Sequence, residues 1–128
     1  MAPDRKKLKR VQLIQRIRNV ERMQSALAAS EAEAVRERLS GVAERTRSLA
    51  THYATREDDA VGADLRGSKA MRDQLQKLTK LSEKQADEAE LQSRTRREAF
   101  VHSDLRLRKA GENTRELVRR ITACPEKN

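Results

Sequence analysis

The sequence predicts an all-α fold, a long two-helix antiparallel coiled-coil hairpin. Small or apolar residues recur at alternating steps of four and three in both halves of the 128-residue chain, and glycines and acidic residues gather near its middle. With 36% hydrophobic, 2% aromatic and 38% charged residues, the composition is too lean for a thick globular core. Strong helix formers and only two prolines favour helix over disorder.

A first helical arm is expected over about residues 5–57, with Asp4 as a candidate cap. Its predicted seam consists of Ala28, Ala32, Val35, Leu39, Val42, Thr46, Leu49 and Tyr53, preceded by Leu13, Ile17, Val20 and Gln24. The step of four after Gln24 breaks strict heptad order and predicts local unwinding of the supercoil. Gly41 lies within the pattern and is interpreted as tolerated or as a mild bend.

A turn is expected over about residues 58–67, because Gly62 and Gly67 fall in a short polar stretch that Ser68 can end as a helix cap. The second arm then covers about residues 68–122, followed by a frayed tail at 123–128. Its predicted seam is Met71, Leu75, Leu78, Ser82, Gln85, Ala89, Gln92, Arg96, Ala99, Ser103, Leu107, Ala110, Thr114, Leu117 and Ile121. The chain would thus form a single elongated helical hairpin over residues 1–128.

Folding the arms about a turn near residue 62 predicts how their seams meet. The expected neighbours are Tyr53 with Met71, Leu49 with Leu75, Thr46 with Leu78, Val35 with Ala89, and Ile17 with Leu107. Few of these residues are large, so the apolar area that the hairpin buries is small. A monomer is therefore expected to be only marginally stable, which makes a homodimer or a binding partner a natural addition.

Charge is distributed unevenly along the predicted hairpin, whose net charge is +9. An antiparallel arrangement brings the start of the first arm and the end of the second together as a basic open end: Arg5, Lys6, Lys7, Lys9, Arg10, Arg115, Arg119 and Arg120. The turn carries the opposite sign, with Glu57, Asp58, Asp59 and Asp64. Such asymmetry can orient a coil in a larger assembly, although solvated charged faces are also usual on coiled coils.

The chain lacks the patterns typical of enzymes, so no catalytic residue, cofactor or metal is expected. His52 and His102 fall on opposite arms, Cys124 is a lone thiol, and the carboxylates of 87–90 would lie on a coil without an enclosing pocket. Nucleic-acid binding is an alternative, because the isoelectric point near 10.3 suits phosphate neutralisation. Against it, Tyr53 and Phe100 are the only aromatic side chains available for stacking on bases.

The start Leu-Lys-Arg-Val-Gln-Leu-Ile-Gln-Arg-Ile-Arg, the two long arms and the scarcity of aromatic residues resemble the FliJ/YscO family of coiled-coil stalk proteins of type III export systems. The resemblance implies a non-enzymatic component of the bacterial flagellar protein export apparatus. It also implies an antiparallel coil that resembles the central stalk of rotary ATPases and docks in a hexameric export ATPase. A basic helical nucleic-acid-associated protein and a structural coiled-coil dimer remain the alternative interpretations.

The resemblance further implies contact between the coil near its tip and the cytoplasmic domain of the export gate. The residues whose spacing fits that contact are Leu49, Tyr53, Met71, Leu75, Leu78 and Ser82. The same residues also fit an ordinary coil seam, and the family carries more aromatic side chains there than Tyr53 alone. The expected location is cytoplasmic, since no signal or spanning run is found, with peripheral membrane association only through partners in the export apparatus.

Overall fold

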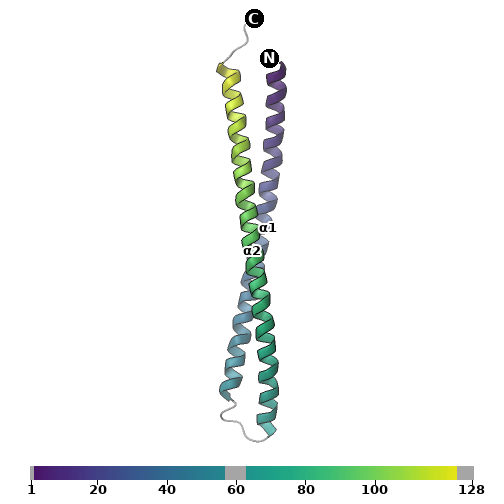
Figure 1. Cartoon of the computed structure of the whole chain (residues 1–128), viewed down its shortest axis with the longest axis vertical. Coiled ribbons are helices and arrows are strands. Elements are labelled where there is room, and N and C mark those ends of the chain that lie inside the picture. Colours follow the sequence, from purple (N-terminus) through teal and green to yellow (C-terminus); the bar gives the residue numbers. More distant parts are fainter. Residues whose placement is uncertain (1, 57–62, 124–128) are drawn as a thin grey trace. The chain divides into compact units, whose positions relative to one another are not determined.

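The computed structural model describes residues 2–56 and 63–123, all of which are helical. Helix α1 spans Ala2–Arg56 and helix α2 spans Ala63–Ala123. The two helices pack against each other in opposite directions, as the cross-helix pairs Ser25–Ser103 and Arg47–Glu83 require (Figure 1). The predicted all-α antiparallel hairpin is confirmed.

The ends of the helices differ from the predicted boundaries. Helix α1 begins at Ala2, so Asp4 lies in its first turn, where a carboxylate favours the positive end of the helix dipole, rather than at the cap. Residues 63–67, predicted in the turn, are helical, and Ser68 lies inside α2 rather than at its start. The remainder of the predicted turn and the tail after Ala123 lie outside the described residues, together with the carboxylates of 57–59.

The chain divides into two compact units. Unit 1 consists of Met1–Ser30 and Thr95–Asn128, and therefore contains the first part of α1 and the last part of α2. Unit 2 is Glu31–Arg94, with the second part of α1 and the first part of α2. Each unit is a pair of antiparallel helical segments, so the surfaces of each unit follow from its own packing.

The seam that α1 buries is an uninterrupted heptad pattern, one residue out of phase with part of the prediction. It consists of Leu8, Val11, Gln15, Arg18, Arg22, Ser25, Ala29, Ala32, Arg36, Leu39, Ala43, Thr46, Ala50 and Tyr53, all buried or half-buried. Leu13, Ile17, Val20 and Gln24 are exposed, so placing them in the seam was wrong, and the buried pattern has no break after Gln24. From Ala32 onward the predicted and the observed seams share every seventh residue, and they differ at the seam positions between these shared residues.

The buried seam of α2 agrees with the prediction over its last third; before it, the predicted Leu75, Ser82 and Ala89 are buried and the predicted residues between them are not. Ser103, Leu107, Ala110, Thr114, Leu117 and Ile121 are buried or half-buried as expected. Earlier in the helix the buried or half-buried residues are Ser68, Arg72, Leu75, Thr79, Ser82, Glu83, Ala86, Ala89, Ser93 and Phe100. The predicted members Met71, Leu78, Gln85, Gln92, Arg96 and Ala99 are exposed instead.

The predicted register between the helices is also wrong, by about one helical turn. Pairing about residue 62 would set Ser25 opposite Ala99, but its hydroxyl lies 2.9 Å from that of Ser103. In unit 2, Arg47 contacts Glu83 rather than a residue near 77. The packing of the seams therefore sets the register, rather than the midpoint of the turn. The first residues of α2 accordingly extend past the Arg56 end of α1 (Figure 1).

The most deeply buried positions carry mainly small side chains. They are Ala43, Thr46, Leu75, Ser82, Ala89 and Ser93 in unit 2, and Ala110 and Leu117 in unit 1. Small residues allow two helices to approach closely, but they bury little apolar area each. Threonine hydroxyls in the seams are satisfied within their own helix: that of Thr46 donates to the carbonyls of Val42 and Ala43 at 3.1 and 3.0 Å.

Gly41 lies in α1 without interrupting it, so alanine should suit this position better. A Cβ added at Gly41 would meet only the end of the Arg45 side chain, at 3.9 Å. We expect Gly41→Ala to raise the free energy of unfolding by about 0.5 to 1 kcal/mol, because it removes the entropy cost of a helical glycine. Urea unfolding followed by circular dichroism measures this change. A loss of stability would show that the helices approach more closely at Gly41 than the structure indicates.

Candidate functional site

In unit 1, polar side chains connect the two helices where their seam is poor in large apolar residues. Arg22 donates from Nε to Oδ1 of Asp104 at 2.7 Å, and its guanidinium lies 5.4 Å from the centre of the Phe100 ring. The hydroxyls of Ser25 and Ser103 lie 2.9 Å apart one turn away. These contacts fix the register of unit 1 and neutralise Asp104, which also pairs with Arg108 at 3.0 Å.

The residues of the predicted basic open end all belong to unit 1, and all eight are exposed. Arg5, Lys6, Lys7, Lys9 and Arg10 lie on the first turns of α1. Their counterparts on the last turns of α2 are Arg115, Arg119 and Arg120. Among them, Arg120 contacts the carboxylate of Glu116 only at 4.0 Å. This concentration of exposed positive charge belongs to the fold of unit 1, and it suits an acidic partner surface.

The predicted partner-binding patch lies in unit 2, where the structure divides it into buried and accessible residues. Leu75 and Ser82 are buried in the seam, with exposed fractions of 8% and 3%, so the packed helix pair leaves little of either side chain accessible to a partner. Leu49, Met71 and Leu78 are accessible, with exposed fractions between 41% and 48%. Tyr53 is half-buried at a seam position, and its ring packs edge-on against that of His52 at 5.9 Å.

A set of apolar residues beside the seam of unit 2 lies on one side of the helix pair. Leu49 directly precedes the seam residue Ala50, and Leu78 directly precedes Thr79, so both residues flank the seam on the same side of an antiparallel pair. Val35, Val42 and Met71 lie on the same side by their seven-residue spacing from Leu49 and Leu78. We call these five residues the side strip: Val35, Val42, Leu49, Met71 and Leu78. The strip is an aliphatic surface beside a small-residue core, and its members on each helix are seven residues, or about two turns, apart.

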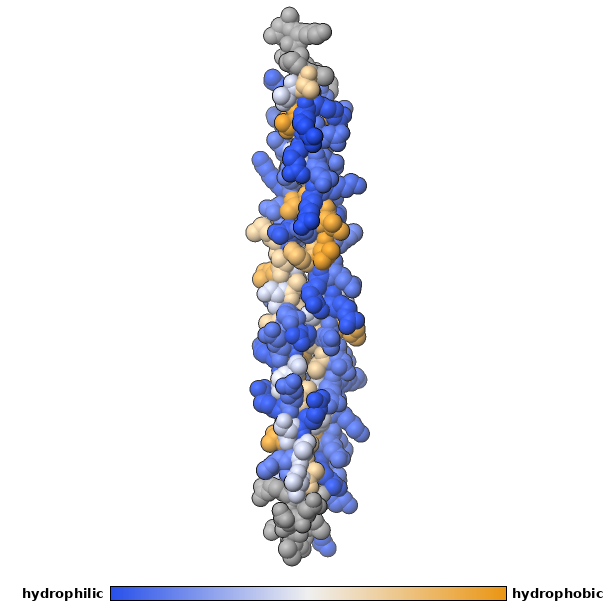
Figure 2. Space-filling model, turned by 90° about the vertical axis from the view of Figure 1, so that its left-hand side faces the viewer, coloured by the Kyte–Doolittle hydropathy of each residue, from blue (hydrophilic) through white to orange (hydrophobic). Residues whose placement is uncertain are grey.

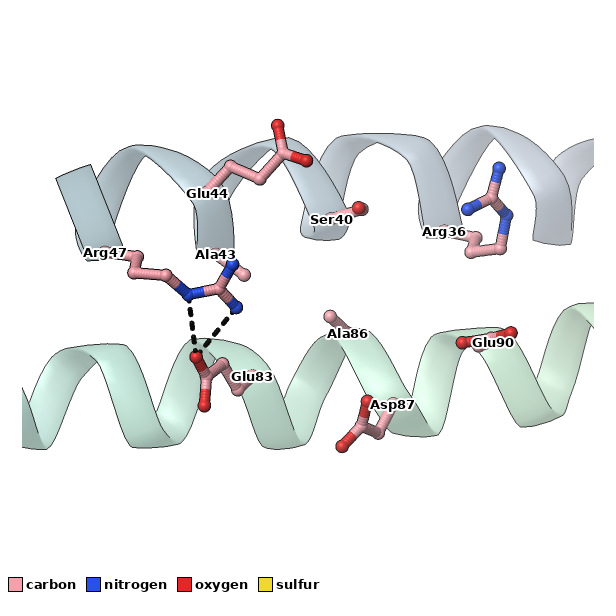
Figure 3. A pocket seen from close by; sticks show the side chains of 9 residues that line it. All are labelled: Arg36, Ser40, Ala43, Glu44, Arg47, Glu83, Ala86, Asp87 and Glu90. Carbon is pink, nitrogen blue, oxygen red and sulfur yellow. Dashed lines mark hydrogen bonds and ion pairs between the residues drawn. The ribbon is translucent and has the colours of Figure 1, made fainter.

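The other side of unit 2 is polar. There Arg47 donates from Nε and Nη2 to one oxygen of Glu83, at 3.1 and 2.8 Å, and bridges the helices over Ala43 and Ala86 (Figure 3). Glu44 and Asp87 point away from the gap between the helices (Figure 3). The resulting hollow is open to solvent and lined by side chains of both charges, which suits no enclosed reaction.

A buried serine of α2 forms a hydrogen bond to a carboxylate of α1 in unit 2. Ser93, with no exposed surface, donates to Oε2 of Glu33 at 2.8 Å. Glu33 also accepts hydrogen bonds from Nε and Nη2 of Arg36, at 3.0 and 2.6 Å. The hydrogen bond and the negative charge of Glu33 raise the pKa of Arg36 above its ordinary value, so this arginine stays charged in the seam.

The structure groups no metal-binding set within residues 2–56 and 63–123. No three His, Cys, Asp or Glu side chains of that part of the chain come close enough to hold a metal ion. His52 and His102 are exposed, as are Asp87, Glu88 and Glu90. The expectation that the chain is not an enzyme stays a prediction.

Sequence reasoning missed a second apolar surface, on α1 in unit 1. Hydrophobic side chains appear in patches between hydrophilic ones on the face in Figure 2. In unit 1 the most exposed of the large apolar side chains on α1 form what we call the outer stripe: Leu13, Ile17, Val20, Met23 and Leu27. Three of them, Leu13, Ile17 and Val20, were predicted in the seam. Leu8 and Val11, which are half-buried in their place, are the signal that distinguishes the two patterns.

Comparison of the chain with protein-family models, with curated proteins and with solved structures finds no match. No helix within the described residues combines the length and the apolar character needed to cross a bilayer.

Proposed function

We propose that this chain is a non-enzymatic coiled-coil component of the flagellar type III protein export apparatus, a stalk that couples a hexameric export ATPase to the export gate. The observation that carries the proposal is the placement of all eight exposed residues of the basic open end in unit 1, on the first turns of α1 and the last turns of α2. A helix pair with one strongly positive surface suits insertion into an acidic socket, in which charge sets the orientation.

The surfaces of unit 2 support the second half of the proposal. A coupling element needs a contact surface that remains accessible when its own helices are packed. The side strip meets this requirement, because Leu49, Met71 and Leu78 stay exposed beside a filled seam. Exposed aliphatic residues flanked by polar ones are typical of protein interaction sites, which supports the side strip as the surface for the proposed export-gate contact.

A pull-down with a purified flagellar export ATPase tests the proposal, using a charge variant of the basic open end. In this variant Arg5, Lys6, Lys9 and Arg10 are replaced by glutamine. The matched control replaces four exposed lysines of unit 2 in the same way: Lys69, Lys77, Lys80 and Lys84. Both variants lose equal charge, so we expect retention of the ATPase to fall roughly tenfold or more only for the first variant.

Two results would contradict the proposed function. The first is no recovery of the ATPase at low salt together with strong retention of DNA, which would make the chain a nucleic-acid-associated protein. Binding of DNA in that case should fall steeply with added salt and should not depend on sequence. The second is an equal loss of ATPase binding in both variants, because it would show that total charge, rather than the surface of unit 1, governs the association.

A further inference from the structure

The outer stripe of unit 1 points away from the helix pair that contains it. Leu13, Ile17, Val20 and Leu27 follow steps of four and three, broken only by Gln24. They lie on the side of α1 opposite its seam, which in this region comprises Val11, Gln15, Arg18, Arg22 and Ser25. Their exposed fractions run from 48% to 62%, so packing against α2 covers none of them fully. Unit 1 is therefore amphipathic on its outside as well as along its seam.

Positive charges flank the outer stripe. Helical geometry places Arg10 and Arg16 on either side of it, with Lys6 and Lys9 continuing its line toward the start of α1. In the first 30 residues the acidic residues are Asp4, on the opposite face, and Glu21. Glu21 is paired with Arg18 at 3.1 Å and with Arg106 at 3.6 Å, so its charge is compensated within unit 1. The face of the stripe is consequently apolar and cationic.

This charge distribution distinguishes between occupants of the stripe. A second copy packed parallel along the stripe would bring the same four cations against their equivalents, and this repulsion opposes the apolar gain. The surface of an anionic bilayer offers negative phosphates beside an apolar boundary, and a helix of this character lies in the plane of that interface. The stripe extends about 21 Å along α1 at about 1.5 Å per residue, which is long enough for a stable interfacial contact.

We propose that unit 1 binds directly to the surface of an anionic lipid bilayer through the outer stripe of α1. The side chains of Leu13, Ile17, Val20 and Leu27 enter the boundary between headgroups and acyl chains. Lys6, Lys9, Arg10 and Arg16 lie at the level of the lipid phosphates. The proposal does not rest on the export role, since it requires neither the ATPase nor the export gate.

Flotation with lipid vesicles tests the proposal on the full-length chain. The vesicles contain phosphatidylcholine alone or with phosphatidylglycerol, and each is used at low and at high salt. The test variant carries Ile17→Gln, Val20→Gln and Leu27→Gln. The matched control carries Leu81→Gln, Leu91→Gln and Leu105→Gln, three similarly exposed leucines of α2 that lie outside the outer stripe and the side strip. Circular dichroism confirms that both variants remain helical.

The expected result is flotation with the anionic vesicles only, weakened by salt. Binding should fall roughly tenfold or more in the outer-stripe variant and should be unchanged in the control, because only the former loses insertion. Three outcomes would overturn the proposal: no flotation with anionic vesicles, equal loss in both variants, or binding that the outer-stripe variant retains in full. Sedimentation of a dimer that only the outer-stripe variant dissociates, without flotation, would identify a second copy as the occupant instead.

Discussion

Leu75→Ala is expected to lower the free energy of unfolding by about 2 to 4 kcal/mol, whereas Leu78→Ala should change it by less than about 0.5 kcal/mol. The two leucines lie three residues apart on α2 and look equivalent in the sequence. Leu75 is 8% exposed in the seam, so its truncation leaves a cavity that small neighbours cannot fill. Leu78 is half-exposed on the side strip, where water already contacts much of its side chain.

Urea unfolding followed by far-ultraviolet circular dichroism measures both changes under the same conditions. The pair of variants controls for composition and helix propensity, because each replaces leucine by alanine within the same helix. A larger loss for Leu78→Ala would mean that the helices pack through the side strip. In that case the seam of unit 2 would be the one that includes Val35, Val42 and Leu49.

Ser93→Leu should cost about 1 to 3 kcal/mol, because the seam has no space for a large side chain at this position. Ser93 has no exposed surface and follows Ala89 in the seam of α2, while Arg36 belongs to the seam of α1. A leucine there would push the helices apart or force strained rotamers. It would also remove the hydrogen bond to Glu33, which measures 2.8 Å.

Ser93→Ala separates the two contributions to this cost. It removes the hydroxyl without adding volume, and Glu33 keeps its hydrogen bonds to Arg36. Because the Glu33 side chain is about 38% exposed, water can replace the lost donor, so we expect a cost of about 1 kcal/mol or less. Thermal unfolding of both variants provides the measurement. Stabilisation by Ser93→Leu would contradict the close approach of the helices at this layer.

The last third of α2 was predictable because the sequence offers only one seam there. Leu107, Ala110, Leu117 and Ile121 repeat at heptad spacing, and the residues that a shift of one position would bury instead include Arg106 and Arg120. Burying those charges without partners is unfavourable, so the alternative phase is excluded from the sequence alone. The structure follows the predicted pattern at every one of these positions.

In unit 2 the sequence offers two seams, and the more apolar one was chosen wrongly. Leu39, Thr46 and Tyr53 belong to both, which explains why they were predicted correctly. The residues that complete the seam are Arg36, Ala43 and Ala50, although Val35, Val42 and Leu49 are more hydrophobic. Small side chains permit closer backbone approach, and Arg36 is tolerated because Glu33 neutralises it, a pairing that periodicity does not reveal.

The candidate surfaces were likewise predictable from the sequence only in part. The sequence identified the eight cations of the basic open end, because charge is visible without coordinates. It did not separate Leu75 and Ser82 from Leu49, Met71 and Leu78, since all five fit one helical pattern. Leu13, Ile17 and Val20 of the outer stripe were predicted in the seam for the same reason: hydrophobic spacing indicates that an apolar face exists but not which neighbour covers it.

By itself, the sequence determined the all-α hairpin, through heptad periodicity in both halves and a turn signal between them. Tertiary structure alone decided the phase and register of the seams, because these depend on which faces of two helices fit together. In unit 1 it paired Ser25 with Ser103 and Arg22 with Asp104, and left Leu13, Ile17, Val20 and Leu27 outside. Close packing of small residues and pairing of polar groups decided which faces meet. The periodicity of a sequence reports only the hydrophobicity of single side chains, so it does not reveal either effect.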